Sequence, residues 1–290
     1  MKKTFLMVAA VAAMLIVTGF TACKPNSPQT PKEVDIYVAG YDYSGTNAVA
    51  KVWKNGKELY ELTDGSNSAA TYSVFVVGGD VYSSGFEDNG TNWVAKVWKN
   101  DNELYALTDG SNDACAKSVF VADDKVYTAG YGGGSVAKLW KNKSATDLTD
   151  GSKTANANSV FVVGDDVYTA GYESNGTNWV AKVWKNKKAI FQTDGTKEAS
   201  ANSVYVVGED IYVAGKEGKV AKVWKNKEEL YELADEGHAQ SIVVHNGDVY
   251  VAGFEKDGSS NVAKVWKNGK ELYSLADKSQ AFSISIVERK

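Results

Sequence analysis

Ala95-Lys96-Val97-Trp98-Lys99-Asn100 is one of six copies of a phrase that recurs along the chain, with Leu in place of Val in the copy that ends at Asn142. The six tryptophans of these copies are Trp53, Trp98, Trp140, Trp184, Trp224 and Trp266. Their spacings of 45, 42, 44, 40 and 42 residues are typical of proteins built from stacked repeats. Residues that recur in every repeat mainly serve the packing of the repeats against one another. We therefore look for functional residues at the positions where the repeats differ.

Each repeat divides into four short strands separated by turn residues. In the second repeat we predict strands at Ser73–Val77, Asp80–Gly85, Trp93–Lys99 and Glu103–Thr108. Gly78-Gly79 favours a two-residue hairpin turn between the first two strands. Both faces of these strands carry apolar residues, which predicts that each small sheet is covered on both sides by other sheets.

The two ends of the repeat region are predicted to complete one another. The first repeat begins at its second strand, Asp35–Gly40, and Phe282–Val287 matches a first strand. An open solenoid would leave both half-repeats unpaired. We therefore predict an all-β protein in which residues 35–290 form a six-bladed β-propeller of four-stranded antiparallel blades. The C-terminal strand would close it by pairing with the N-terminal blade.

The N-terminus has the features of an export signal. Lys2 and Lys3 precede an apolar run from Phe5 to Phe20, which predicts a secretory signal peptide over residues 1–22. The run is shorter than the ~20 residues of a membrane-spanning helix. Thr21-Ala22-Cys23 resembles a bacterial lipobox, so we expect Cys23 to carry a lipid anchor. Residues 23–34 would then form a tether, and the location would be the outer membrane.

Composition narrows the partners and the chemistry. The formal net charge of −4 and a single arginine, Arg289, give no basic surface for nucleic acid. With Cys23 lipidated, Cys115 has no partner for an intrachain disulfide. We expect Cys115 to be a small buried apolar side chain.

The repeats resemble those of bacterial lipoprotein propellers built from the motifs VYVAGY, AKVWKNG and LTDGS. The resemblance covers Asp35 to the C-terminus. It implies a propeller fold and a cell-envelope location. It implies no chemistry that transfers to individual residues, and the Gly-His and Trp-Asp signature of WD40 repeats is absent.

Charged residues that recur in all six repeats are interpreted as structural. We expect the aspartates after the fourth strands to accept backbone N–H groups in turns: Asp64, Asp109, Asp150, Asp194, Asp235 and Asp277. The lysines of the repeated phrase are expected to pack their stems and reach these aspartates: Lys51, Lys96, Lys138, Lys182, Lys222 and Lys264. The glycine of every second strand is likewise given a structural role.

Six positions that differ between repeats are the first candidate site. They stand just before the serine that opens each predicted first strand: Tyr72, Lys117, Asn158, Asn202, Gln240 and Phe282. First strands line a propeller's channel, so these residues would circle one mouth of it and could bind a polar ligand. Solvent-exposed turns that tolerate any residue would give the same variation.

A second candidate is the loop Asn89-Gly90-Thr91-Asn92-Trp93, which recurs before Trp179. Tryptophan beside asparagine and threonine is a frequent arrangement in sugar-binding sites. The loop opens on the same face as the first candidate, so the two are predicted to share a rim. Packing at the start of the third strand would explain Trp93 and Trp179 equally well.

Catalysis is the least supported class. His238 and His245 are the only histidines, and their spacing is no helix-borne metal motif. We predict no catalytic residue, metal or cofactor. The favoured function is a lipid-anchored module that binds a glycan or a peptide. A scaffold for an envelope protein assembly is the alternative, and a propeller hydrolase with a central site is the second alternative.

Overall fold

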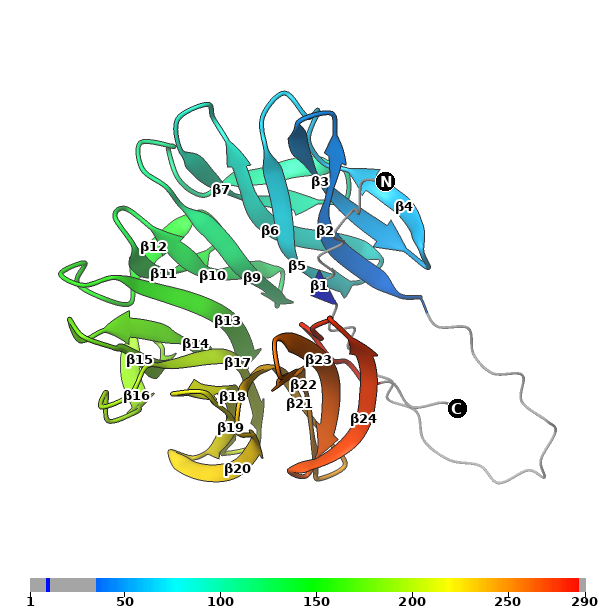
Figure 1. Cartoon of the computed structure of the whole chain (residues 1–290). Coiled ribbons are helices and arrows are strands. Elements are labelled where there is room, and N and C mark those ends of the chain that lie inside the picture. Colours follow the sequence, from blue (N-terminus) through cyan, green and yellow to red (C-terminus); the bar gives the residue numbers. More distant parts are fainter. Residues whose placement is uncertain (1–8, 11–34, 287–290) are drawn as a thin grey trace, which may run out of the picture.

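The computed structural model describes residues 9–10 and 35–286, and these residues form strands without a helix. The strands make six four-stranded antiparallel sheets, which are arranged around a common centre (Figure 1). This all-β architecture confirms the predicted fold class and is consistent with a six-bladed propeller.

The strands follow one another in chain order within each sheet. The first three sheets are β1–β4 (Ala9–Ala10, Tyr37–Ser44, Asn47–Lys54, Lys57–Glu61), β5–β8 (Ala69–Val77, Asp80–Asp88, Trp93–Lys99, Asn102–Ala106) and β9–β12 (Cys115–Ala122, Lys125–Gly132, Val136–Lys141, Ser144–Asp147). The other three are β13–β16 (Ala155–Val163, Asp166–Ser174, Trp179–Lys185, Lys188–Gln192), β17–β20 (Ala199–Val207, Asp210–Glu217, Val220–Lys225, Glu228–Ala234) and β21–β24 (Gly237–His245, Asp248–Asp257, Ser260–Lys267, Lys270–Asp277).

The asparagine of the repeated phrase makes the turn between the third and fourth strands. Asn100 has a φ of 57°, a left-handed conformation that asparagine tolerates better than most residues. Its Oδ1 accepts the N–H of Val81 at 3.0 Å, and its own N–H donates to the Val81 carbonyl at 2.7 Å. Each turn is therefore tied to the start of the second strand.

The core lies between neighbouring sheets. Trp140 of the third sheet packs with Val97 of the second and Val119 of its own sheet. Five of the six repeat tryptophans are almost fully buried in this way: Trp98, Trp140, Trp184, Trp224 and Trp266. Trp53 of the first sheet is only half-buried. The prediction that both faces of a sheet are covered holds for the second to fifth sheets in chain order.

The first sheet is completed differently from the prediction. Ala9 and Ala10 form β1 and pair with Ala39 and Val38 of β2. The predicted C-terminal strand is not a strand in residues 282–286, and Val287 lies outside the described residues. A two-residue strand from the predicted signal peptide therefore holds the inner edge of β2.

Candidate functional site

Five of the six variable residues of the first candidate site lie inside strands, not before them. In β5 the pairing runs from Thr71 opposite Gly85 to Ser73 opposite Ser84, which leaves Tyr72 as the extra residue of a β-bulge. The predicted start of this strand at Ser73 was wrong, because the ladder continues on the other side of the bulge. The same bulge holds Lys117, Asn158, Asn202 and Gln240 in β9, β13, β17 and β21. Bulges of this kind re-aim side chains at the rims of closed β-structures.

Glycine is required opposite each bulge. A Cβ atom on Gly130 would lie 1.9 Å from the carbonyl oxygen of Cys115, far inside contact distance. The same clash, at 1.9 to 2.0 Å, would occur at Gly85, Gly171, Gly215 and Gly253. The structural role predicted for these glycines is therefore explained: they let the bulged inner strand approach the second strand.

Three predicted site residues form one continuous stack. The Nζ of Lys117 lies 3.8 Å from the centre of the Tyr72 ring. Tyr72 stacks on Phe86 at 6.1 Å between ring centres, and Phe86 stacks on Trp93 at 4.2 Å. Phe86 joins the two candidate sites and was not singled out from the sequence. Trp93 keeps 37% of its surface exposed, so the stack ends at solvent.

Burial further favours the protonated form of the phenol in this stack. Desolvation raises the pKa of Tyr72, with smaller contributions from Cys115, Tyr131 and Tyr41. The phenol therefore stays protonated at neutral pH and can donate a hydrogen bond.

The asparagines of the first candidate site bridge neighbouring sheets. Asn158 Nδ2 donates to the Ala201 carbonyl at 3.1 Å, and Asn202 Nδ2 donates to the Ala239 carbonyl at 3.0 Å. These amides hold adjacent inner strands together. Gln240 and Phe282 are half-buried, and Phe282 lies in the segment after β24.

The loops before Trp93 and Trp179 are fixed by their own amides. Asn89 and Asn92 both donate through Nδ2 to the Gly110 carbonyl, at 3.1 and 3.0 Å. Asn175 and Asn178 make the equivalent bonds to Gly195. Trp179 stacks on Tyr172 at 4.6 Å and is 38% exposed. Each tryptophan is therefore a partly exposed ring held over an aromatic partner.

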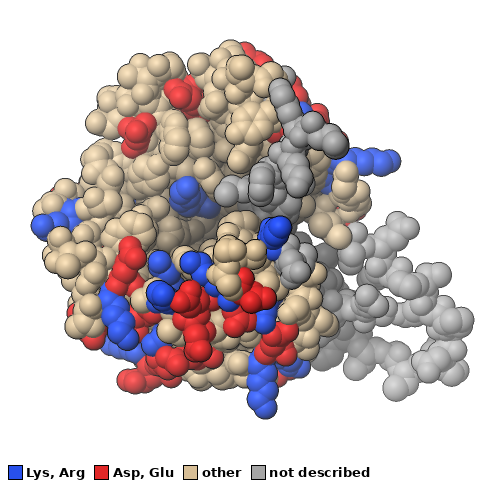
Figure 2. Space-filling view, viewed as in Figure 1, with Lys and Arg blue, Asp and Glu red and all other residues tan. Residues whose placement is uncertain are grey.

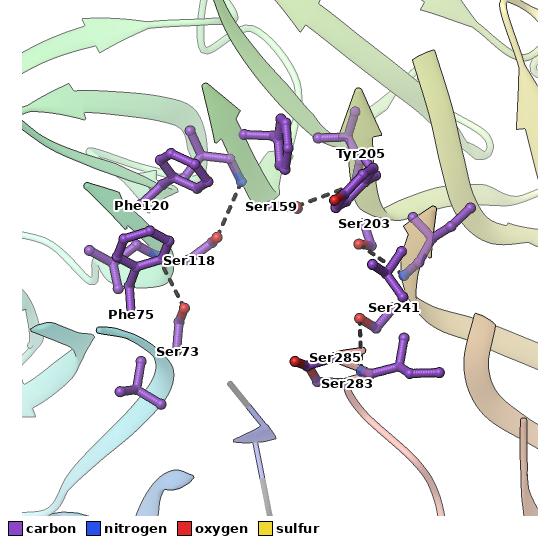
Figure 3. A pocket seen from close by; sticks show the side chains of 18 of the residues that line it. Ser73, Phe75, Ser118, Phe120, Ser159, Ser203, Tyr205, Ser241, Ser283 and Ser285 are labelled. Atoms are coloured by element: carbon purple, nitrogen blue, oxygen red, sulfur yellow. Dashed lines mark hydrogen bonds between the residues drawn. The ribbon is translucent and has the colours of Figure 1, made fainter. Parts of the chain in front are cut away.

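A ring of serines surrounds a central cavity of about 200 Å³ (Figure 3). The Oγ of Ser73 accepts the N–H of Val119 from the next sheet at 3.2 Å. The pattern continues from sheet to sheet through Ser118 and Val160, Ser159 and Val204, Ser203 and Ile242, and Ser241 and Ile284. Each hydroxyl keeps a proton that it can donate.

Aromatic rings form an arc beside these serines. Phe75, Phe120, Phe161 and Tyr205 follow one another at 4.7, 5.3 and 4.7 Å between ring centres (Figure 3). These serines and rings were not predicted to have a role. The signal was present as a Ser-Val-Phe or Ser-Val-Tyr triplet in four repeats.

The repeat lysines are paired with carboxylates other than the predicted aspartates. Lys96 Nζ lies 2.5 Å from Glu87 and 2.6 Å from Glu103. Lys138 binds Asp147. The other five lysines bind glutamates of the second or fourth strand of their own sheet: Lys51, Lys96, Lys182, Lys222 and Lys264. The expectation that these lysines reach the turn aspartates was wrong, because carboxylates on the adjacent strands lie beside each lysine.

The aspartates after the fourth strands have the predicted turn role in four repeats. Asp109 Oδ1 accepts the N–H and the hydroxyl of Ser111 at 3.0 and 2.7 Å, which lowers the pKa of Asp109. The bond to the backbone N–H two residues on is repeated at Asp64, Asp150 and Asp194.

The remaining reactive groups are buried or isolated. Cys115 is fully buried, as predicted, and burial raises the pKa of its thiol to about 11. His238 stacks on Phe254 at 4.9 Å; burial, Lys216 and Lys256 lower its pKa to about 4. Within residues 9–10 and 35–286, no three His, Cys, Asp or Glu side chains gather closely enough to hold a metal ion.

Charge is distributed unevenly over the face of the molecule that Figure 2 shows. Figure 2 shows acidic and basic side chains gathered over β17–β24, whereas the surface over β5–β12 is largely uncharged. Ion pairs of the charged region include Lys216 with Glu198 and Lys219 with Glu236. The stack of Lys117, Tyr72, Phe86 and Trp93 belongs to the second and third sheets.

Comparisons with known proteins give no family assignment. No model of a known protein family matches the chain, and no curated protein matches it. In the part of the chain that the structure describes, no helix has the length and apolar character needed to cross a membrane.

Proposed function

We propose that this chain is an exported, lipid-anchored protein of the cell envelope, a closed six-bladed propeller that binds a glycan or a peptide on its rim. The export signal over residues 1–22 and the lipidated Cys23 come from the sequence alone. Apart from residues 9–10 they lie outside the described residues. The outer membrane is the proposed location.

Closure of the ring through Phe282–Val287 is supported by the serine ring. The N–H of Ile284 donates to Ser241 Oγ at 3.2 Å, as the N–H of Ile242 donates to Ser203. Ile284 therefore already lies where the inner strand of a following sheet would begin its contacts. Pairing of this segment with β2 would complete the first sheet.

Two uncovered apolar faces also support closure. Ile36 is 60% exposed, whereas its counterpart Val81 is 3% exposed. Tyr273 and Leu275 of β24 are 57% and 56% exposed, although Leu107, the counterpart of Leu275, is buried. No hydrophobic cluster of the described residues joins the sixth sheet to the first. Bringing these two sheets together would bury side chains that every other sheet buries.

The stack of Lys117, Tyr72, Phe86 and Trp93 is the observation that carries the binding site. It brings residues from two sheets to one place and ends in a partly exposed indole. Trp93 offers a partly exposed ring face, and the other end of the stack adds the Tyr72 phenol and the Lys117 cation. This combination suits a ligand that has both C–H faces and polar groups. Sugars and aromatic peptide side chains have this character, and we favour a glycan.

The scaffold alternative requires an exposed apolar patch. The only large apolar side chains that the described part of β24 exposes are Leu272, Tyr273 and Leu275. Closure of the ring would cover them, which leaves them unsuited to a second protein. Trp93, the exposed end of the stack of Lys117, Tyr72, Phe86 and Trp93, would stay accessible after closure.

A thermal-shift screen of the chain from Lys24 onward against glycan fragments and cell-wall peptides tests the proposal. A ligand that binds only the folded protein stabilises it by about 2.7 kcal/mol at 100 times its dissociation constant. We expect one chemical class to raise the unfolding midpoint. Trp93→Ala should abolish that shift. Leu272→Ala, away from the rim, should leave it unchanged, and a panel without any shift would contradict ligand binding.

A further inference from the structure

The inner edge of β2 is occupied differently from the equivalent edge in the other five sheets. In every other sheet a strand of eight or nine residues from the same repeat occupies the equivalent edge. Among the described residues of the first sheet, Ala9 and Ala10 are the ones paired there, and β1 also lies against β5 (Figure 1). An unpaired strand edge presents a row of N–H and C=O groups that another strand can bind.

The repeat register identifies which residues of the C-terminal segment would pair there. In the sixth sheet Ile242 pairs with Val251 and Ser241 pairs with Ala252. The equivalents of Val251 and Ala252 in the first sheet are Val38 and Ala39. The triplet Ser283-Ile284-Ser285 aligns with Ser241-Ile242-Val243, so Ile284 would pair with Val38 and Ser283 with Ala39.

These two partners are already taken. Ala10 pairs with Val38, and Ala9 pairs with Ala39. One edge of a strand cannot pair with two segments at the same residues. The N-terminal and C-terminal segments therefore require the same two positions of β2.

We infer that the N-terminal segment holds the edge of β2 as a placeholder, and that the C-terminal segment closes the ring only when Ala9 and Ala10 have left. This inference rests on the proposed closure. Cleavage of the signal peptide would remove Ala9 and Ala10 and so permit closure. The uncleaved chain would keep an open ring in which Ile36 and the apolar side chains of β24 are exposed. The cleaved chain should also gain a sixth serine bond, from the N–H of Val74 to Ser283 Oγ.

A disulfide between positions 38 and 284 would report closure directly. Residues directly opposite in an antiparallel pair have Cα atoms about 4.5–5.5 Å apart, within the range that a disulfide spans. The test uses the full chain with Cys23→Ser, Val38→Cys and Ile284→Cys, because Cys23→Ser removes both the lipid site and a competing thiol. The disulfide is measured by gel shift under oxidising conditions.

Substitutions in the N-terminal segment then decide the question. Ala9→Pro with Ala10→Pro removes two N–H groups and disfavours strand pairing, whereas Ala10→Val keeps both. We expect at least a threefold higher disulfide yield in the proline variant than in the chain with Ala9 and Ala10, and no increase with Ala10→Val. Equal yields in all three chains would overturn the competition while leaving closure intact.

Failure of closure itself would look different. If no disulfide forms even in a chain that begins at Lys24, the C-terminal segment does not pair with β2, and both proposals fall. A register control, Val38→Cys with Ile286→Cys, should give little product. Labelling of Tyr273→Cys by a thiol reagent supplies an independent readout: closure should slow it at least threefold in the proline variant, and an unchanged rate would contradict closure.

Discussion

Lys117 places its Nζ 3.8 Å from the centre of the Tyr72 ring, across the boundary between the second and third sheets. Both residues are the extra residues of β-bulges in neighbouring inner strands. The contact therefore joins two variable positions that the repeat itself does not require. The same kind of bulge therefore places side chains that differ from repeat to repeat.

This contact should contribute a measurable coupling to stability. Lys117→Met keeps most of the apolar stem and removes the charge, and Tyr72→Leu removes the ring. We expect a double-mutant cycle to give about 0.5–1 kcal/mol of coupling in urea unfolding. Lys143 lies 5.8 Å from the Tyr105 ring and is the matched control, with a smaller expected coupling. Equal coupling for both pairs would show that proximity to Tyr72 gives no added stabilisation.

The glycine opposite a bulge should be among the least replaceable residues. In Gly130→Ala the new Cβ would lie 1.9 Å from the Cys115 carbonyl oxygen, so the inner strand would have to move. We expect a loss of about 3 kcal/mol or more. Gly79→Ala is the control: its φ is 90° with no atom within 4 Å, so it should cost about 1–2 kcal/mol. Similar losses at the two positions would contradict the steric explanation.

The fold could be predicted because the residues that pack between sheets recur in every repeat. The residues of the candidate site do not recur. The spacing of Trp98 and its equivalents reports a contact that recurs between sheets, so the number of repeats followed from it. The turn residues within each repeat then gave its four strands. The bulges escaped prediction because an extra residue in a ladder leaves no local mark apart from a glycine on the opposite strand. Gly85 was recognised as structural, but nothing in the sequence links it to Thr71, its partner, or to the bulged residue Tyr72.

The site could be predicted only as a set of positions. Tyr72, Lys117 and Trp93 were chosen from the sequence, but Phe86, which connects them, looked like an ordinary strand residue. The lysine partners were misassigned for a related reason. The pairing register of the strands brings Glu87 and Glu103 beside Lys96. Strand positions predicted without their bulges do not give this register.

The repeat tryptophans of the first and second sheets should respond differently to substitution by alanine. Trp98 is 1% exposed, and Trp98→Ala should cost about 3–5 kcal/mol. Trp53 is half-buried, so Trp53→Ala should cost less in the full chain. In a chain that begins at Lys24, closure would bury Trp53 and bring its cost close to that of Trp98. Chemical denaturation of the four variants measures this, and a cost for Trp53 that is independent of the N-terminal segment would argue against closure.

His238 should make stability depend on pH between about 4 and 6.5. Burial against Phe254, with Lys216 and Lys256 nearby, lowers its pKa from 6.5 to about 4. In this interval the unfolded chain binds a proton that the folded chain does not, so stability falls as pH falls. The contribution is complete above pH 6.5 and is lost as the pH approaches 4. Because the ring is partly exposed, we expect a loss of about 1 kcal/mol.

The variant His238→Phe isolates this group. It keeps a ring that can stack on Phe254 and has no proton to bind. Its Tm should therefore change less than that of the unaltered chain between pH 7 and pH 4.5. Both proteins should lose stability below pH 4, where turn carboxylates such as Asp109, whose pKa is lowered in the folded state, become protonated. Parallel Tm profiles above pH 4.5 would mean that His238 is hydrated in solution and that its stacking on Phe254 does not persist.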